Sequence, residues 1–250
     1  MLPTQVLKRS LLVAVATLFC AVMAVSQEHE SWDYSKAHGP KHWSEVSALC
    51  GTGHSQSPIN IVSATKTQLP ALEFSYQAAP ANVINNGHTV QENYAPGSDL
   101  VFQGKTYELV QFHFHHISET AIKGKHAPLE VHLVHKDKDG NLLVVAVLLD
   151  EGAANPAVAS VFANIGPEKG KANTPSGVTV NAAQLLPEKR NYYTFTGSLT
   201  TPPCSENVTW VVMVNPMTVS KGQIDAFAKL YPHDARPVQP LDGRKVQESE

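Results

Sequence analysis

Three histidines have the residue types and spacing of a metal site. His113 and His115 lie two residues apart in Gln-Phe-His-Phe-His, and His132 lies in Glu-Val-His-Leu-Val-His. Because successive side chains of a β-strand point to opposite faces, His113 and His115 would share one face of a strand. Two neighbouring strands would then direct three imidazoles to one point. Three neutral nitrogens suit Zn²⁺ and leave a fourth coordination position open, as in catalytic zinc sites.

The residues around these histidines favour a metal site over the polar face of an ordinary amphipathic strand. The chain contains 12 histidines, so a His-x-His pair alone would mean little. Phe112 and Phe114, however, give the same strand an apolar opposite face. Gln111 and Glu130 have the parity needed to accept the second N–H of metal-bound imidazoles, a contact that fixes ring orientation.

These residues belong to a longer series of motifs that resembles the α-class carbonic anhydrases. The motifs keep the order found in that family and run from about residue 32 to about residue 246. They are Gln56-Ser-Pro-Ile-Asn60, Asn85-Asn-Gly-His88, Gln111-Phe-His-Phe-His115, Ser118-Glu119, Glu130-Val-His-Leu-Val-His135, Ser198-Leu-Thr-Thr-Pro-Pro-Cys204 and Arg236-Pro-Val-Gln-Pro-Leu241.

The resemblance implies a fold and a reaction. The fold would be a single mainly β (α/β) domain, built on a large twisted, mostly antiparallel sheet with short peripheral helices. The zinc cofactor would lie at the bottom of a cone-shaped cleft, bound by His113, His115 and His132. The reaction would be the reversible hydration of CO₂ to bicarbonate and a proton by a zinc-bound hydroxide.

The resemblance also assigns roles to residues beside the metal. Thr200 would accept the proton of the hydroxide and so orient it, provided that Glu119 takes the proton of the Thr200 hydroxyl. His88 would carry the released proton to solvent, because an imidazole titrates near neutral pH. Tyr34 and Asn86 would order the water between the metal and His88.

CO₂ carries no charge, so an apolar wall beside the metal would bind it. The hydroxyl of Thr201 would face bicarbonate. Composition alone could not distinguish the wall residues from ordinary core. By resemblance they are Val134, Val144, Leu199, Val208 and Trp210.

Three positions depart from the family pattern. Thr120 stands where a histidine is usual, Gln91 where many members have asparagine, and Asp234 where asparagine is usual. The family uses the backbone carbonyl at the last of these positions to orient the second zinc histidine, here His115. None of the three changes removes a metal ligand or the threonine–glutamate pair, so they bear on the rate more than on the reaction.

Two other functions are compatible with parts of this pattern. His113, His115 and Glu119 have the His-x-His-x₃-Glu spacing of a cupin-type oxygenase, in which Glu119 would be a ligand to iron or manganese. The Gly-rich second histidine motif of cupins is missing. A non-catalytic binding domain or a zinc buffer is the other alternative. It is disfavoured because the proposed ligands are all present and the other histidines are scattered.

The N-terminus predicts export. Two basic residues precede an apolar run from Leu11 to Val25, and small residues at positions 24–26 form a signal-peptidase site. We predict a signal peptide over residues 1–26 and one catalytic domain over residues 27–250, in the periplasm or secreted. A retained anchor is the alternative, although the run is short for a membrane span. A lipoprotein modified at Cys20 is another alternative, although bulky Phe19 precedes this cysteine.

Removal of this segment takes two basic residues with it and moves the formal net charge from −3 to −5. That balance argues against a nucleic-acid partner. The expected partner is the small-molecule substrate, CO₂ or bicarbonate, with no stable membrane anchor; a homodimer stays open. Cys50 and Cys204 would be the two remaining cysteines, which in an oxidising compartment predict a disulfide. Two buried thiols are the alternative.

The sequence also predicts the strands that would carry these residues. Asp139-Gly140 is a hairpin signal between two of them. Asn155-Pro156 predicts the start of one short helix, and a surface helix follows Ser220. The tail after Val246 is polar and is predicted to fray. Alternating or β-branched runs predict strands near residues 72–76, 81–93, 99–116, 128–136, 141–149 and 206–214.

Overall fold

Two long strands form the centre of the sheet in the computed structural model, which describes residues 31–250. β8 (Lys105–His115) and β10 (Leu129–Lys136) pair antiparallel, with His132 directly opposite His113. β11 (Leu142–Glu151) returns beside β10 after a turn in which Gly140 has a positive φ of 86°. Glycine adopts that conformation without strain, so the predicted hairpin is confirmed. The predicted signal peptide lies outside the described residues.

The remaining strands extend this centre into a mixed sheet of 13 strands within residues 31–250. Most neighbouring pairs are antiparallel, and the exceptions are β11 with β15, β11 with β16 and β17 with β2. The strands so far unnamed are β2 (Thr65–Thr67), β3 (Glu73–Ser75), β5 (Val83–Asn85), β6 (Val90–Asn93), β7 (Asp99–Phe102), β12 (Ala172–Asn173), β14 (Tyr192–Ser198), β15 (Glu206–Met213), β16 (Met217–Val219) and β17 (Gln247–Ser249).

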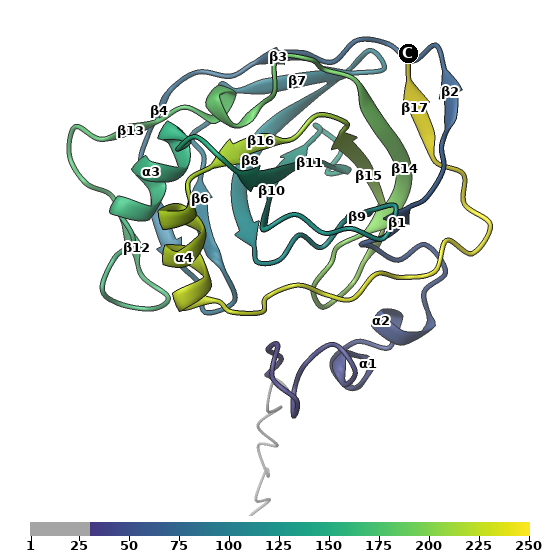
Figure 1. Ribbon diagram of the computed structural model, residues 1–250, viewed down its shortest axis with the longest axis horizontal. Coiled ribbons are helices and arrows are strands. Elements are labelled where there is room, and N and C mark those ends of the chain that lie inside the picture. The colour runs from purple at the N-terminus through teal and green to yellow at the C-terminus, as the bar shows by residue number, and fades with distance from the viewer. Residues whose placement is uncertain (1–30) are drawn as a thin grey trace, which may run out of the picture.

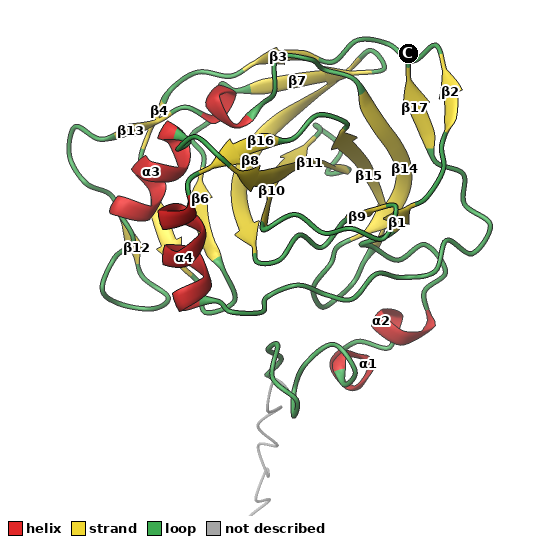
Figure 2. Cartoon of the chain, viewed as in Figure 1, coloured by secondary structure: helices red, strands yellow, loops and turns green. Residues whose placement is uncertain are grey.

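Two further pairs of very short strands stand apart from the main sheet. All six strand ranges predicted from the sequence are confirmed, and two of them divide at tight turns into β5–β6 and β7–β8. Figure 2 shows that helices are short and peripheral, as predicted for a mainly β domain. The small pairs are β1 (Asn60–Ile61) with β9 (Ala121–Ile122), and β4 (Ala79–Pro80) with β13 (Thr179–Val180).

The two longer helices cover one face of the sheet and lie together in Figure 1. α3 (Pro156–Ala163) begins where the Asn155 side chain accepts two backbone N–H groups, and α4 (Lys221–Leu230) begins with a capping box at Ser220. Both predicted helix starts are confirmed. The Phe162 and Phe227 rings stack at 5.7 Å, and both contact Phe114 on β8.

The sheet buries apolar side chains on both faces. Phe112 and Phe114 face the larger cluster, beneath α3 and α4. Val134 and Trp210 belong to a second cluster on the opposite face. The strand alternation therefore places His113, His115 and His132 on the side of the second cluster. A one-residue register slip would exchange these faces, so burial on both sides fixes the position of the histidines.

The C-terminal region corrects one prediction. Instead of fraying, Gln247–Ser249 forms β17, which pairs with β14 on one side and with β2 on the other. The Ser249 hydroxyl also accepts the backbone N–H of Tyr192 at 2.9 Å. The polar sequence gave no strand signal, because the order of this segment comes from its two neighbours.

A disulfide joins Cys50 and Cys204, as predicted. Cys50 lies in α2 (Leu49–Thr52), which follows α1 (Trp43–Val46), and Cys204 ends the loop after β14. Arg236 reinforces this junction by donating to the Cys50 carbonyl at 2.8 Å. The loop that carries Thr200 is thereby tied to the N-terminal region. Among residues 31–250, no helix has the length and apolar character needed to span a bilayer.

Candidate metal centre

Three imidazoles converge where β8 and β10 pair. His113 and His115 project from the same face of β8, and His132 projects beside them from β10. The ring centroids are 5.1 Å apart for His113 and His115, 5.4 Å for His113 and His132, and 4.6 Å for His115 and His132. One nitrogen from each ring lies within 4.8 Å of the others. The structure therefore brings together the three residues selected from the sequence.

The outer nitrogens of the two β8 histidines are already engaged. His113 Nδ1 donates to Gln111 Oε1 at 2.8 Å, and His115 Nδ1 donates to the backbone carbonyl of Asp234 at 2.7 Å. These contacts leave Nε2 of each ring for the common point. His115 Nε2 is buried and has no hydrogen-bond partner among residues 31–250. Burial lowers the pKa of both histidines, which favours neutral rings.

The third histidine is oriented by Glu130. His132 Nε2 lies 3.2 Å from Glu130 Oε1, which leaves Nδ1 for the common point. Burial alone would raise the pKa of Glu130, but His132 and the hydrogen bonds from Thr120 hold it below its ordinary value. The Thr120 N–H and hydroxyl donate to the two carboxylate oxygens at 2.8 and 2.7 Å. Thr120, a departure from the family pattern, thus fixes Glu130 itself.

This donor set fits Zn²⁺. Zinc binds neutral imidazole nitrogens, and its histidine ligands characteristically donate their second N–H to a carboxylate, a carbonyl or water. Here those acceptors are an amide oxygen, a backbone carbonyl and a carboxylate. A metal would bind the buried Nε2 of His115, which has no hydrogen-bond partner among residues 31–250.

Glu119 lies beside the histidines in the loop after β8 and is fully buried. Its Oε1 accepts the Arg236 N–H at 2.8 Å, and its Oε2 lies 3.6 Å from His115 Nε2. Burial raises the pKa of Glu119 to about 7, while His132, the Arg236 N–H and the Thr200 side chain act to lower it. Thr200 is thus a close neighbour, but Oε2 has no partner of hydrogen-bond geometry within the described residues.

The five residues predicted as an apolar wall all lie in the second cluster or pack against it. The Trp210 ring meets His132 edge-on at 5.0 Å, which places the wall next to the imidazoles. Gly197 allows this packing, because a Cβ there would lie 2.7 Å from Trp210 Cδ1. Thr201 is half-buried in the same loop as Thr200.

The His88 turn is held by its own backbone contacts. Asn86 Oδ1 accepts the N–H groups of His88 and Thr89, both at 2.9 Å. The His88 ring stacks on Trp32 with centroids 3.8 Å apart, and burial lowers its pKa. His88 and Trp32 line a depression of about 550 Å³ that also borders Pro202, in the loop that carries Thr200.

Tyr34 lies on the same side as this depression. Its ring meets Trp32 edge-on at 6.0 Å. Burial raises the pKa of Tyr34 well above its ordinary value, and Glu119 and Asp234 raise it further. The negative charges of these two carboxylates therefore disfavour ionisation of the Tyr34 hydroxyl.

Comparison with known proteins decides the family. The chain matches the family model for eukaryotic-type carbonic anhydrases over residues 38–250. The chain belongs to the α-class carbonic anhydrases. A carbonic anhydrase from Nostoc is 40% identical over 255 residues, covering 98% of this chain and 97% of its own length. One from Pectobacterium carotovorum is 42% identical over 245 residues, covering 96% and 99%.

A solved structure agrees with this assignment. The α-carbonic anhydrase of Photobacterium profundum superimposes with a TM-score of 0.82 at 43% identity, covering 88% of this chain and all of that one. Membership in the carbonic anhydrase family, whose members are in general zinc enzymes with this fold, excludes the cupin alternative. The predicted fold class is confirmed by the same comparison.

Some residues around the carbonic anhydrase site were not singled out from the sequence as site residues. Trp32 was only the start of the family resemblance, and Arg236 belonged to a quoted motif, but neither had a chemical pattern of its own. Asp234 was noted for its carbonyl, yet its side chain also contributes, since Oδ1 accepts the His116 N–H at 2.7 Å. Burial raises the pKa of the Asp234 carboxyl to about 9. A protonated Asp234 would resemble the asparagine usual in carbonic anhydrases.

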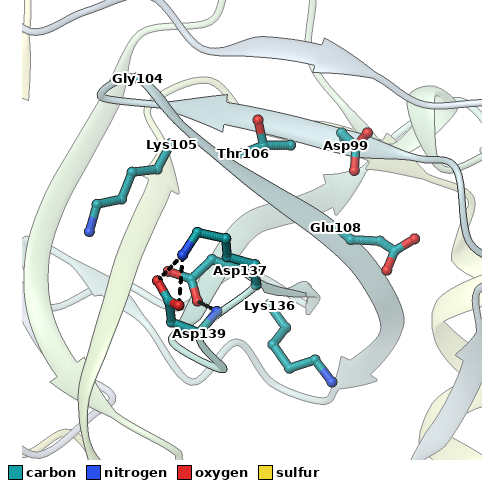
Figure 3. A pocket seen from close by; sticks show the side chains of 9 residues that line it. Asp99, Gly104, Lys105, Thr106, Glu108, Lys136, Asp137 and Asp139 are labelled. Carbon is teal, nitrogen blue, oxygen red and sulfur yellow. Dashed lines mark hydrogen bonds and ion pairs between the residues drawn. The ribbon is translucent and has the colours of Figure 1, made fainter.

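A second hollow, of about 670 Å³, lies at the other end of β8 and β10 (Figure 3). Three of its charged side chains pair with one another or hold the β10–β11 turn. Lys138 Nζ bonds to Asp139 at 2.8 Å, and Asp137 accepts from the N–H groups of Asp139 and Asn141. None of the residues predicted for the carbonic anhydrase site lines it.

Proposed function

We propose that this protein catalyses the reversible hydration of CO₂ to bicarbonate, with one Zn²⁺ bound by His113, His115 and His132. The observation that carries the proposal is the convergence of three imidazoles in a chain of the carbonic anhydrase family, two with their outer nitrogens hydrogen-bonded and the third, His132, with its outer nitrogen 3.2 Å from Glu130 Oε1. Zinc, when bound, would supply a Lewis acid that makes water acidic enough to react near neutral pH.

Thr200 and Glu119 orient the reacting oxygen in this proposal. A hydroxyl that donates to a carboxylate has its lone pairs free to accept, so Glu119 directs the Thr200 hydroxyl to accept a hydrogen bond from the nucleophile. Glu119 itself is fixed by the Arg236 N–H. This pair thus selects one orientation of the nucleophile for attack.

The apolar wall binds CO₂ without a charged contact. Val134, Val144, Leu199, Val208 and Trp210 exclude water from the side of His132 against which Trp210 packs. The Thr201 hydroxyl faces the product bicarbonate. An uncharged substrate and a charged product therefore meet different surfaces, which favours release of bicarbonate after the reaction.

His88 carries the proton out of the cleft. Its position beside the 550 Å³ depression suits exchange with solvent buffer. Asn86 fixes the backbone of the turn, and Tyr34 orders the water on the path. The lowered pKa of His88 helps it release the proton once acquired.

We also propose a signal peptide over residues 1–26 and a catalytic domain over residues 27–250, exported to the periplasm or secreted. The Cys50–Cys204 disulfide supports export, because such bonds persist in oxidising compartments. The substrate is the only partner that this proposal requires.

The test combines zinc analysis with stopped-flow CO₂ hydration on the same mature protein. One zinc per chain is expected, and His132→Ala should lose both zinc and activity. The matched control is His54→Ala, because the His54 side chain is 89% exposed. Equal zinc content in the wild type and His132→Ala would overturn the metal assignment, and a zinc-loaded wild type without CO₂ hydration would overturn the reaction.

A further inference from the structure

Four side-chain amides form a continuous ladder beside the candidate metal centre. Asn86 Nδ2 donates to Gln91 Oε1 at 3.4 Å, and Gln91 Nε2 donates to Asn93 Oδ1 at 2.6 Å. Asn93 Nδ2 then donates to Asn82 Oδ1 at 3.3 Å. We call these four residues the amide ladder. The three hydrogen bonds within it all run in the same direction, from Asn86 towards Asn82.

The amide ladder joins the His88 turn to the metal-binding strand. Gln91 and Asn93 share the half-buried face of β6, and they lie opposite His113 and Gln111 on β8. Directly opposed residues of antiparallel strands have neighbouring side chains. The middle of the ladder therefore lies beside the His113–Gln111 hydrogen bond. At one end Asn86 holds the backbone of His88.

The direction of the ladder is fixed at the Asn86 end. Asn86 Oδ1 accepts two backbone N–H groups, so its NH₂ must face Gln91. Gln91 then presents its carbonyl to Asn86 and its NH₂ to Asn93. Asn82 is anchored in turn, because its backbone N–H donates to Glu92 and its carbonyl accepts the Asn93 N–H.

This direction makes the amide ladder a wall of donors beside His113. Each of the three amides that donate within the ladder has two N–H groups and uses one there, so the second can bind water. Water bound to such a wall accepts from the protein and keeps its own hydrogens for neighbouring waters. That polarity is what a proton path needs, since hydrogen bonds in a chain polarise one another.

We propose that Asn93 is a positioning residue for proton transfer to His88. Asn93 contacts neither His88 nor the metal ligands in this role. It fixes the orientation of the Gln91 amide, whose carbonyl accepts from Asn86. Gln91 departs from the asparagine usual in the family, and its longer side chain reaches both neighbours. This inference rests on the proposed function, in which His88 carries the proton.

Two variants of Asn93 distinguish a role in orienting the Gln91 amide from a general role in stabilising the structure. Asn93→Ala removes the acceptor of Gln91 Nε2, so the Gln91 amide can rotate. Asn93→Asp keeps that acceptor oxygen and should preserve the ladder up to Gln91. Asn173→Ala is the matched control, because Asn173 is a half-buried strand asparagine whose side chain bonds to Asn164 outside the ladder.

The first readout is independent of activity and of zinc. Side-chain NH₂ resonances of Gln91 and Asn86 are recorded by NMR in the zinc-free and zinc-loaded protein. Hydrogen exchange of the Gln91 amide should rise about fivefold or more in Asn93→Ala and stay near the wild-type rate in Asn93→Asp and Asn173→Ala. An unchanged Gln91 amide in Asn93→Ala would overturn the proposal.

The second readout is CO₂ hydration in dilute buffer, with His88→Ala in the same series. Asn93→Ala should lower kcat about threefold or more, leave kcat/KM within about twofold, and recover when imidazole is added. If His88→Ala is slow but Asn93→Ala keeps the wild-type kcat, the inference about Asn93 is overturned and the proposed function stands. The inference is also overturned if Asn93→Ala lowers kcat and kcat/KM in parallel, or if Asn93→Asp is as slow as Asn93→Ala. A wild type without hydration, or an unaffected His88→Ala, overturns the proposed function and this inference with it.

Discussion

Replacing Glu92 by glutamine should change how the stability of this protein depends on pH. Glu92 lies on β6 and is fully buried. Its Oε1 accepts the Asn82 N–H at 2.9 Å, but its Oε2 has no hydrogen-bond partner among residues 31–250. Burial raises the pKa of Glu92 to about 7, and the single hydrogen bond offsets this only in part. The carboxyl is therefore neutral in the folded protein at acidic pH.

The sign of the effect follows from the two pKa values. The unfolded chain releases the Glu92 proton near the ordinary value of 4.5, whereas the folded chain retains it to about 7. The stabilisation is complete below the unfolded pKa and is lost as the pH rises through the folded pKa. At about 1.4 kcal/mol per pKa unit, the upper limit is about 3 kcal/mol, and relaxation around the charge should reduce it to about 2 kcal/mol.

Urea unfolding followed by tryptophan fluorescence at pH 5, 6, 7 and 8.5 measures this difference. Relative to wild type, Glu92→Gln should gain about 2 kcal/mol between pH 5 and pH 8.5, because glutamine cannot ionise. Glu73→Gln is the control, since Glu73 is exposed on β3. The reasoning would be refuted if the difference in unfolding free energy between Glu92→Gln and wild type stayed constant within about 0.5 kcal/mol across this pH range.

Three other changes test separate parts of the site. Glu119→Gln should keep zinc but lower the CO₂ hydration rate about tenfold or more, because Thr200 loses its acceptor; metal analysis with stopped-flow kinetics decides, and lost zinc or an unchanged rate contradicts it. Thr120→Val should weaken zinc affinity about tenfold in competition with a chelator, because Glu130 loses the hydroxyl bond of 2.7 Å, and equal affinity would exclude that role. The double variant Cys50→Ser/Cys204→Ser should lose about 2–4 kcal/mol in urea unfolding, because the bond closes a separation of 154 residues; wild-type stability would disprove it.

The central strands could be predicted because their patterns are local. β8 alternates apolar and polar residues near its end, and β10 places Leu and Val between its glutamate and histidines. β14 was not predicted, although it holds an interior position in the sheet. Its sequence ends in Gly197-Ser198, and glycine weakens a strand pattern. A Cβ at Gly197 would collide with Trp210 on β15, so this position requires glycine because of tertiary packing.

The candidate site likewise has parts that local sequence predicts and parts that depend on tertiary contacts. The shared face of His113 and His115 follows from strand parity alone, and the motif resemblance added Thr200 and His88. The hydrogen bond from the Arg236 N–H to Glu119 could not be inferred from spacing, because 117 residues separate the two. The stacking of His88 on Trp32 likewise depends on how a distant loop packs.

The position of β17 has a consequence for biogenesis. Because β17 lies between β14 and β2, the edges of both strands stay unpaired until residues 247–249 have been synthesised. The sheet is therefore complete only after β17 has emerged from the ribosome, and unpaired edges are the surfaces on which chains aggregate. Chaperones that hold the chain during synthesis should thus bind it until β17 has emerged.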